Sequence, residues 1–390
     1  MGKGKIAEKL IVILVLLCLG FAGGTARLRP AVAQPPAPAQ NPAPAQTPEV
    51  QSTQPPASSP PAETAPPAET PAPPTPTPEP TVYTMHFVGD CTLASDVYHQ
   101  GGPEGYDTVI AGDFAYPFAR TLQYFEGDDF TLANLECALT ESKNATAKTF
   151  VYKAGAEYAR IMTEGSVEFV SLANNHVLDY GQAGYDDTKA AVEAVGLAYA
   201  GRDEWALYQT EKGLLIGVYA VSFGSVEQIK KGVAAVREAG AQFVIAALHF
   251  GTEGSYHVNA EQIADAHAAI DAGADFVYGS HAHTLQPWEE YKGKYIYYSM
   301  GNWTFGGNTN PRDKDTFILR LTVQQDFDGT VTVTEREHIP CACSGETNRN
   351  NYQPTPYEEG SEGWNRVMSK LDGSFQGADL SIGYGYTANE

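Results

Sequence analysis

The feature that most constrains the fold is a regular alternation of short apolar runs with amphipathic, helix-type segments. The apolar runs, each typical of a buried strand, are residues 82–90, 129–136, 167–176, 214–222, 243–251 and the start of 275–307. The helix-type segments are residues 116–125, 184–195, 226–240 and 259–273. Strands that alternate with helices form βαβ units, so the sequence predicts an α/β protein with a largely parallel sheet.

The pattern changes after Gly293, where strand-type segments follow one another without helices between them. These segments are residues 295–300, 316–325 and 330–336, with a hairpin turn at 327–329. Successive strands joined by a tight turn indicate a mixed or second sheet. Residues 341–390 are polar and glycine-rich, and predict a tail with one short helix at 364–371.

Polar residues of the metal-binding or catalytic kind stand directly after five of the apolar runs. They are Asp90, Glu136, Asn175 with His176, His249, and His281 with His283. Because the carboxyl ends of parallel strands meet at one edge of a sheet, these side chains are expected to converge. Gly-Asp and Asn-His pairs also occur by chance in turns, and the alternative for residues 281–283 is a polar loop with two unrelated histidines.

Carboxylates, a carboxamide and imidazoles together form an oxygen and nitrogen ligand set. Such a set suits a divalent transition metal (Mn, Zn or Fe) at one or two positions. Two adjacent ions would hold an anionic oxygen and activate water for attack. The ligand set favours a metal-dependent hydrolase, and the alternative is a degenerate site that binds no metal.

The N-terminal part of the chain has a different composition. Lys3, Lys5 and Lys9 precede an apolar run that starts at Leu10, so residues 1–33 are expected to be a signal peptide or signal anchor. A buried core helix is the alternative. Residues 34–80 are rich in Pro, Ala and Thr and predict a disordered stalk, or a linker without a spacing role. The folded domain is expected at 81–340, in an extracytoplasmic protein that is membrane-anchored or secreted.

The net charge limits the partners of the chain. The formal charge is −22, and no basic, aromatic-rich stripe offsets it. Nucleic acid is therefore not an expected partner. An anionic polymer would also be repelled unless cations bridge it to the protein.

The order of the motifs GD, NLE, NNH, HFGTE, GSHAH and SMGNWTF resembles the CapA family. That family is named for poly-γ-glutamate capsule synthesis and is similar to calcineurin-like metallophosphoesterases. The resemblance covers about residues 82–339. It implies a four-layer α/β/β/α sandwich, with two central mixed sheets flanked by helices. It also implies surface anchoring, a γ-linked polyglutamate partner and membrane synthase subunits.

The resemblance implies that one half of a dinuclear metal centre is intact. Its ligands would be Asn175, His249 and His281, with Glu136 as the bridging carboxylate. The other half would use Asp90, His283 and Glu136. It departs from the phosphoesterase pattern, because Thr92 replaces the histidine of the usual D-x-H motif. One tightly bound ion and a weaker second ion are expected.

The resemblance also suggests catalytic and substrate-binding residues. His176 would be the general acid, with Asp179 orienting it. The alternative for Asp179 is a helix N-terminal carboxylate. Glu253 is a candidate general base or substrate contact, or else a solvated loop charge. Asn174 and Asn302 are candidate substrate-binding residues, and for Asn302 a turn role is the alternative.

Two cysteines stand next to expected ligands. Cys91 follows Asp90 and Cys137 follows Glu136. They would form a disulfide that braces the two loops, remain reduced near the metal, or be unrelated buried cysteines; export favours oxidation.

The functions that remain open are of three classes. The first is a metal-dependent hydrolase or transferase acting on an anionic amide or phosphoester. The second is a non-catalytic accessory or anchoring subunit of a polymer synthesis or export complex. The third is a cell-surface binding module, which leaves the convergent strand ends unexplained.

Overall fold

The computed structural model describes residues 26–27 and 79–380. The expected signal segment (1–33) and stalk (34–80) lie outside these ranges apart from Ala26–Arg27 and residues 79–80. Within the described ranges, no helix combines the length and the apolar character needed to cross a bilayer.

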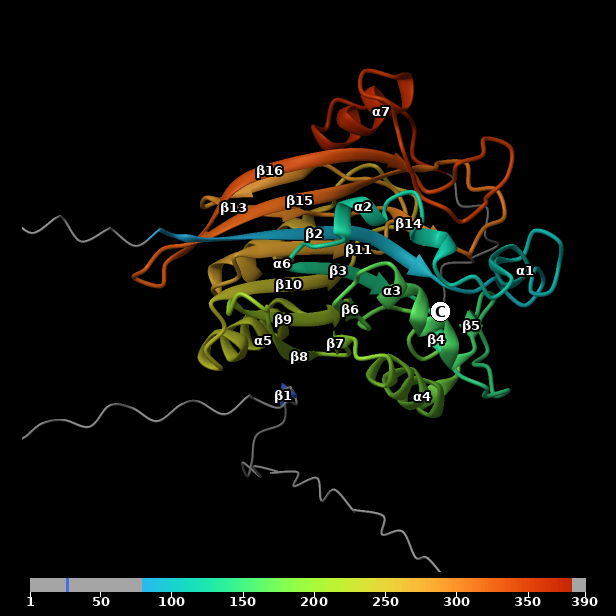
Figure 1. Ribbon diagram of the computed structural model, residues 1–390, viewed down its shortest axis with the longest axis horizontal. Helices are drawn as coiled ribbons and strands as arrows, with labels where there is room; N and C mark the ends of the chain where they lie inside the picture. Colours follow the sequence, from blue (N-terminus) through green and yellow to red (C-terminus); the bar gives the residue numbers. More distant parts are fainter. Residues whose placement is uncertain (1–25, 28–78, 381–390) are drawn as a thin grey trace, which may run out of the picture.

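Two mixed β-sheets form the centre of the fold (Figure 1). The first sheet has the strand order β1 (Ala26–Arg27), β8 (Glu204–Gln209), β9 (Leu215–Ser222), β10 (Phe243–His249), β11 (Phe276–Ser280), β13 (Lys294–Tyr297) and β12 (Trp288–Tyr291). The second has the order β17 (Thr355–Pro356), β16 (Val331–Ala342), β15 (Asp315–Gln325), β2 (Thr81–Thr92), β3 (Phe130–Leu135), β6 (Phe169–Ser171) and β7 (Ala198–Ala200), with β14 (Asn302–Phe305) beside β2. A separate pair consists of β4 (Ala138–Leu139) and β5 (Lys153–Ala154).

The parallel strands are divided between the two sheets. Strands β9, β10, β11 and β13 are parallel neighbours in the first. Strands β2, β3, β6 and β7 are parallel neighbours in the second. The alternation of strands and helices therefore predicted parallel pairing correctly but was wrong in suggesting a single sheet. The late strands β15 and β16 are antiparallel and extend the second sheet beside β2.

Helices lie between most of these strands. They are α1 (Tyr106–Ile110), η1 (Tyr116–Phe118), α2 (Leu122–Phe125), η2 (Ala156–Ala159), α3 (Arg160–Glu164), α4 (Gly181–Ala194), α5 (Val226–Glu238), α6 (Ala260–Asp271) and α7 (Glu362–Leu371). The prediction of a single helix at 116–125 is wrong, because the segment forms two short helices, η1 and α2, with a break that includes Thr121. The Thr121 hydroxyl donates to the Phe118 carbonyl at 3.2 Å, and this local bond competes with the helical ladder.

Each central strand is buried on both faces, which explains its unbroken apolar sequence. On β10, Phe243, Ile245 and Ala247 belong to an apolar cluster that also contains residues of the second sheet. The alternate residues Val244 and Ala246 belong to another cluster, shared with α5 and α6. Side chains alternate between the faces of a strand, so one run can serve two cores.

Two glycines allow the chain to pass very close to itself beneath the strand ends. A Cβ on Gly89 would lie 2.0 Å from the Gly301 carbonyl oxygen, and one on Gly279 would lie 2.2 Å from that of Tyr298. The Asp90 amide donates to the Gly301 carbonyl at 2.8 Å. Only glycine permits these approaches, which fix the position of the residue that follows each glycine.

The short helix predicted at 364–371 in the C-terminal segment is present as α7 (Glu362–Leu371), and it packs on the domain. Val367 and Leu371 of this helix are buried in the cluster between the sheets. Figure 1 shows α7 above β16. Lys370 donates to Asp313 and to Asp315, each at 2.7 Å, and the guanidinium of Arg366 makes two 2.7 Å bonds to Asp315. This buried ion network attaches α7 to the start of β15.

The four cysteines in the described residues are buried and free. The braced-loop disulfide between Cys91 and Cys137 is therefore not formed in this structure. Burial raises the pKa of both thiols, that of Cys137 to about 12. Both sulfurs are thus protonated at neutral pH and are poor metal ligands.

Replacing Lys370 should test the ion network. Lys370→Met removes one partner and leaves Asp313 without its cation, and should lower the free energy of unfolding by about 3 kcal/mol. Urea denaturation at pH 7 measures this change. The matched control is Lys292→Met, since the exposed ion pair of Lys292 with Asp271 should leave the unfolding midpoint unchanged. Equal midpoints for both variants would contradict the role given to Lys370.

Candidate metal and catalytic site

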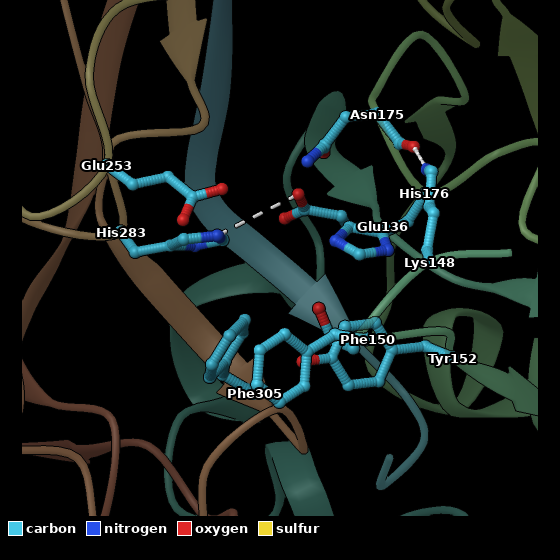
Figure 2. A pocket seen from close by; sticks show the side chains of 10 residues that line it. Glu136, Lys148, Phe150, Tyr152, Asn175, His176, Glu253, His283 and Phe305 are labelled. Atoms are coloured by element: carbon cyan, nitrogen blue, oxygen red, sulfur yellow. Dashed lines mark hydrogen bonds and ion pairs between the residues drawn. The ribbon is translucent and has the colours of Figure 1, made fainter. Parts of the chain in front are cut away.

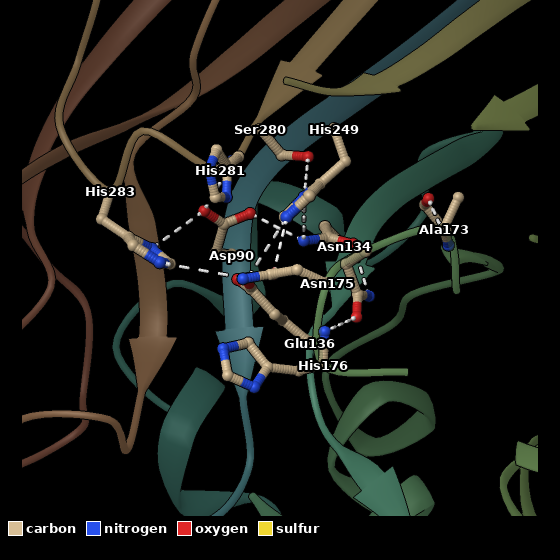
Figure 3. Close-up of polar contacts among 12 residues, drawn as sticks. Asp90, Asn134, Glu136, Ala173, Asn175, His176, His249, Ser280, His281 and His283 are labelled. Carbon is tan, nitrogen blue, oxygen red and sulfur yellow. Dashed lines mark hydrogen bonds and ion pairs between the residues drawn. The ribbon is translucent and has the colours of Figure 1, made fainter. Parts of the chain in front are cut away.

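The predicted site residues come together where the carboxyl ends of the two sheets face each other (Figure 3). The second sheet supplies Asp90 at the end of β2, Glu136 after β3 and Asn175 after β6. The first sheet supplies His249 at the end of β10, and His281 with His283 after β11. Neither sheet alone contains a complete ligand set, so the site depends on how the two sheets pack.

Two groups of ligand atoms share one carboxylate. The ligand atoms of Glu136, His249 and His281 lie within 4.8 Å of one another, and so do those of Asp90, Glu136 and His283. The grouping is the one that the family pattern implied, with Glu136 common to both halves. Each group could therefore hold a metal ion.

The buried polar atoms of this site fit a bound cation. Both carboxylate oxygens of Glu136 are buried and accept no hydrogen bond within the described residues. The nearest imidazole nitrogens are His249 Nε2 at 3.5 Å and His283 Nε2 at 3.9 Å. The Nδ1 of His281 is likewise buried without a hydrogen bond. Burying such groups unpaired costs several kcal/mol, and a divalent ion would supply the missing partner.

Burial also sets the protonation states. It raises the pKa of Glu136 well above its usual value, and the neighbouring Asp90 adds to this. It lowers the pKa of His249 well below the usual value and that of His281 to about 3. Burial acts the same way on His283, but Glu136 and Asp90 outweigh it and raise that pKa to about 10. His249 and His281 are thus neutral at pH 7 and can offer lone pairs, whereas His283 would release a proton on binding a metal.

Surrounding side chains orient the ligands. Asn134 donates to Asp90 at 2.8 Å and accepts from Asn174 at 3.1 Å. The Nδ1 of His249 lies 2.9 Å from the Ser280 hydroxyl. Such outer contacts fix ring orientation and are part of a working metal site. Sequence reasoning missed Asn134, although it stands two residues before Glu136 in the NLE motif.

Asn302, predicted to bind substrate, is not among the residues that line the cavity beside the metal groups. It is 6% exposed, its Oδ1 lies 2.8 Å from His283 Nδ1, and its amide donates to the His283 carbonyl at 3.2 Å. Asn302 therefore positions a ligand and is not placed to contact substrate. The loop that it holds is strained, because His281 has a φ of 96° and His283 a φ of 57°.

His176 and Asp179 form a hydrogen-bonded pair at the edge of the metal groups. The His176 Nδ1 lies 2.7 Å from Asp179 Oδ2, and the Asp179 side chain is fully buried. Asp179 also accepts from the Tyr152 amide at 2.8 Å and from Lys148 at 3.0 Å. These contacts match an orienting carboxylate better than a helix N-terminal one, since α4 begins only at Gly181.

A cavity of about 230 Å³ opens beside these groups. Figure 2 shows it from close by. The lining residues are Thr92, Glu136, Lys148, Phe150, Tyr152, Asn175, His176, Glu253, His283 and Phe305. Glu253 thus reaches the cavity as expected. Thr92, which stands where the family pattern has a histidine, has a buried hydroxyl oxygen without a hydrogen bond in the described residues.

Lys148, Phe150, Tyr152 and Phe305 were missed by sequence reasoning. Three of them lie in the KTFVY stretch between β4 and β5, which has no helical or strand periodicity. The only local signal was a lysine beside aromatic residues in an acidic chain.

Comparison with known proteins shows the family of this chain. The profile of the family described as "Bacterial capsule synthesis protein PGA_cap" matches residues 84–307. The chain belongs to this family. The resemblance to CapA proteins is thereby confirmed.

Three relatives show how far the similarity extends. The chain is 28% identical to "PGA biosynthesis protein CapA" of Bacillus subtilis (strain 168), over 65% of this chain and 71% of that protein. It is 26% identical to "Capsule biosynthesis protein CapA" of Bacillus anthracis, over 74% and 77%. It is 27% identical to the "Probable polyglutamine synthesis accessory protein" of Mycobacterium tuberculosis (strain CDC 1551 / Oshkosh), over 56% and 68%. A solved structure, that of TT1561 from Thermus thermophilus, aligns over 66% of this chain and 99% of its own with 10% identity and a TM-score of 0.38, too low to support an argument.

Removing the imidazoles should abolish metal binding by this capsule synthesis family member. We expect about one transition-metal ion per chain in the purified protein and none in the double variant His281→Ala/His283→Ala, because each ligand group loses an essential nitrogen. Elemental analysis measures the metal content. His267→Ala, which removes an imidazole stacked on Tyr291, should keep the metal. If metal is present in the same amount in the parent protein, the double variant and His267→Ala, the ion is bound elsewhere.

Proposed function

We propose that this chain is a cell-surface protein that acts on γ-linked polyglutamate or a related anionic polymer during capsule synthesis or processing, through a metal-dependent hydrolase-like site. The observation that carries the proposal is that Glu136, which both ligand groups share, and His176, which Asp179 orients, line one cavity. The names of the Bacillus relatives support the polymer as substrate.

The metal would be held by the two ligand groups described above. Glu136, His249 and His281, joined by Asn175, would hold a tightly bound Mn, Zn or Fe ion, and Asp90, His283 and Glu136 a weaker one. A bound ion supplies a Lewis acid that polarises a carbonyl or phosphoryl oxygen and lowers the pKa of water. The oxygen and nitrogen ligands suit any of these three metals.

His176 would act as the general acid. Its Nδ1 is held by Asp179, so its Nε2 is the nitrogen left to exchange a proton with a substrate in the cavity. In amide hydrolysis, water adds to the carbonyl carbon, the C–N bond breaks, and the leaving amine takes a proton, which His176 would give. Glu253 also lines the cavity and would accept the proton that the attacking water loses.

Lys148 would recognise the anionic substrate. Its side chain is 38% exposed and lies between Asp179, at 3.0 Å, and the cavity. An ammonium has three protons, of which Asp179 and the Asn175 carbonyl accept two. The remaining proton is available to a carboxylate of the polymer. A local cation of this kind offsets the repulsion expected from the net charge of −22.

The proposal includes the four-layer sandwich implied by the resemblance. The separate apolar clusters on the helix-covered sides of the two sheets support it. It also includes an extracytoplasmic location, attachment to the membrane through the N-terminal segment, and membrane synthase subunits as partners.

A non-catalytic accessory or anchoring role is the second candidate. The observation that favours it is Thr92, which leaves the Asp90 half of the centre with fewer ligands than the phosphoesterase pattern has. The name of the Mycobacterium relative also describes an accessory protein. In that role the same cavity would hold a polymer end without cleaving it.

His176 substitutions should separate the two roles. His176→Ala should lower kcat on a γ-linked glutamate oligomer by about 10²–10⁴-fold with the metal content unchanged, because the leaving amine loses its proton donor. Asp179→Asn should give a smaller loss. Amine release, measured beside elemental analysis, checks both.

Lys292→Gln is the control for these variants. Lys292 lies in the β12–β13 turn, at the amino end of β13. The site lies at the carboxyl ends of the parallel strands, so removal of Lys292 should leave turnover unchanged. If the metal-loaded parent protein turns over neither γ-glutamyl amides nor phosphoesters, the enzymatic proposal fails and the accessory role is favoured.

A further inference from the structure

A second cavity, of about 460 Å³, lies next to the first. Lys148 and Asn175 line both cavities. The other lining residues come mostly from the end of β9 and from the segments that follow β6, β7 and β9, with Thr146 from between β4 and β5, so this cavity also spans the carboxyl ends of both sheets. Nothing in the mechanism proposed above uses it.

The second cavity has more positive than negative character. Arg202 lines it, at the point where the chain crosses from β7 in the second sheet to β8 in the first. The guanidinium donates to the neutral amide oxygen of Gln182 at 3.0 Å, so its charge is not matched by a carboxylate there. Asp203 also lines the cavity, and its carboxylate accepts a hydrogen bond from the hydroxyl of Tyr219 at 2.5 Å. The lining therefore has two cationic side chains, Lys148 and Arg202, and one anionic side chain.

A helix end adds to this positive potential. Gly224 and Gln228 line the cavity, and they flank Ser225, the N-cap of the 13-residue helix α5. The positive end of the α5 dipole therefore borders the cavity. Lys148, Arg202 and α5 together make a region in this acidic protein that favours carboxylates.

Phe223 stands between the second cavity and the metal ligands. Its ring meets the His281 ring edge-on, with centroids 4.8 Å apart, yet 57% of the residue is exposed. Its φ of 48° is strained for a residue with a side chain. An exposed aromatic ring held in this way offers a flat surface for the amide and methylene groups of a chain.

We infer that the second cavity is a subsite for a neighbouring glutamate residue of the same γ-linked chain whose reacting residue occupies the first cavity. This inference rests on the proposed function. Arg202 binds the free α-carboxylate of the neighbouring residue, Lys148 lies between the two bound residues, and Phe223 packs against the chain. The site therefore prefers a γ-linked chain to a single glutamate.

Binding of two probes of different length tests the inference. The probes are the single-residue γ-glutamyl methylamide and γ-linked hexaglutamate, titrated calorimetrically into the whole chain, with His176→Ala present in every variant so that ligand is not consumed. We expect the hexamer to bind more tightly than the single-residue probe and Arg202→Gln to weaken hexamer binding by about tenfold. Binding of the single-residue probe should change by less than about twofold.

Two matched variants complete the design. Arg202→Lys keeps the charge and should retain part of the hexamer affinity. Lys292→Gln removes one positive charge at the opposite edge of the sheet and should change neither affinity. Retained binding of the single-residue probe in each variant shows that the protein is folded.

The outcomes separate this inference from the function on which it rests. Equal hexamer affinities for the parent and Arg202→Gln would overturn the subsite and leave the proposed function intact. Failure of both probes to bind the parent protein would overturn the proposed function and, with it, the subsite.

Discussion

The buried carboxylate of Glu136 is the group on which the rest of the site depends. It lies after a fully buried strand, has no hydrogen-bond donor among the described residues, and is common to both ligand groups. An unpaired carboxylate in such a place is among the most costly groups a protein can bury. Burial keeps His249 and His281 neutral, and the neighbouring Glu136 and Asp90 hold the proton on His283. A cation beside Glu136 would supply the partner that this carboxylate lacks among the described residues.

The packing of two sheets creates this arrangement. Carboxylates and the carboxamide come from the second sheet and imidazoles from the first, so the ligand sets form only where the two sheets meet. Gly89 in the second sheet and Gly279 in the first both lie against the segment 297–301. A side chain at either position would collide with a backbone carbonyl of that segment. Asp90 is then held from both sides, by the amide of Asn134 at 2.8 Å and by the backbone amide of His281 at 3.3 Å. The strained backbone of the histidine loop is part of the same constraint.

The proposed action on an acidic polymer needs local cations, and Lys148 and Arg202 lie beside the site. Lys148 contacts Asp179, which in turn holds His176, so the proposed substrate-binding cation is connected to the proposed general acid. In that function, the connection would couple recognition of a carboxylate to orientation of the general acid. Long-range charge would keep the polymer away from most of the surface, whereas Lys148, Arg202 and the α5 terminus favour it here.

Apolar periodicity and strand-end polarity are local properties, so the sequence predicted most of the long strands, helices α4 to α7 and the polar residues that follow the strands. It did not predict strands β4, β5, β7, β8, β12, β14 and β17 or helices α1 and α3. It predicted Asp90, Glu136, Asn175, His249, His281 and His283 as one group, and these residues do converge. Which strands share a sheet is visible only in the fold, since a strand buried on both faces carries no mark of its neighbours. The tertiary structure also decided that Asn302 orients His283, that α7 packs on the domain, and that Lys148, Phe150 and Tyr152 reach the cavity. Those roles arise from contacts between segments distant in the chain, and no local pattern encodes such contacts.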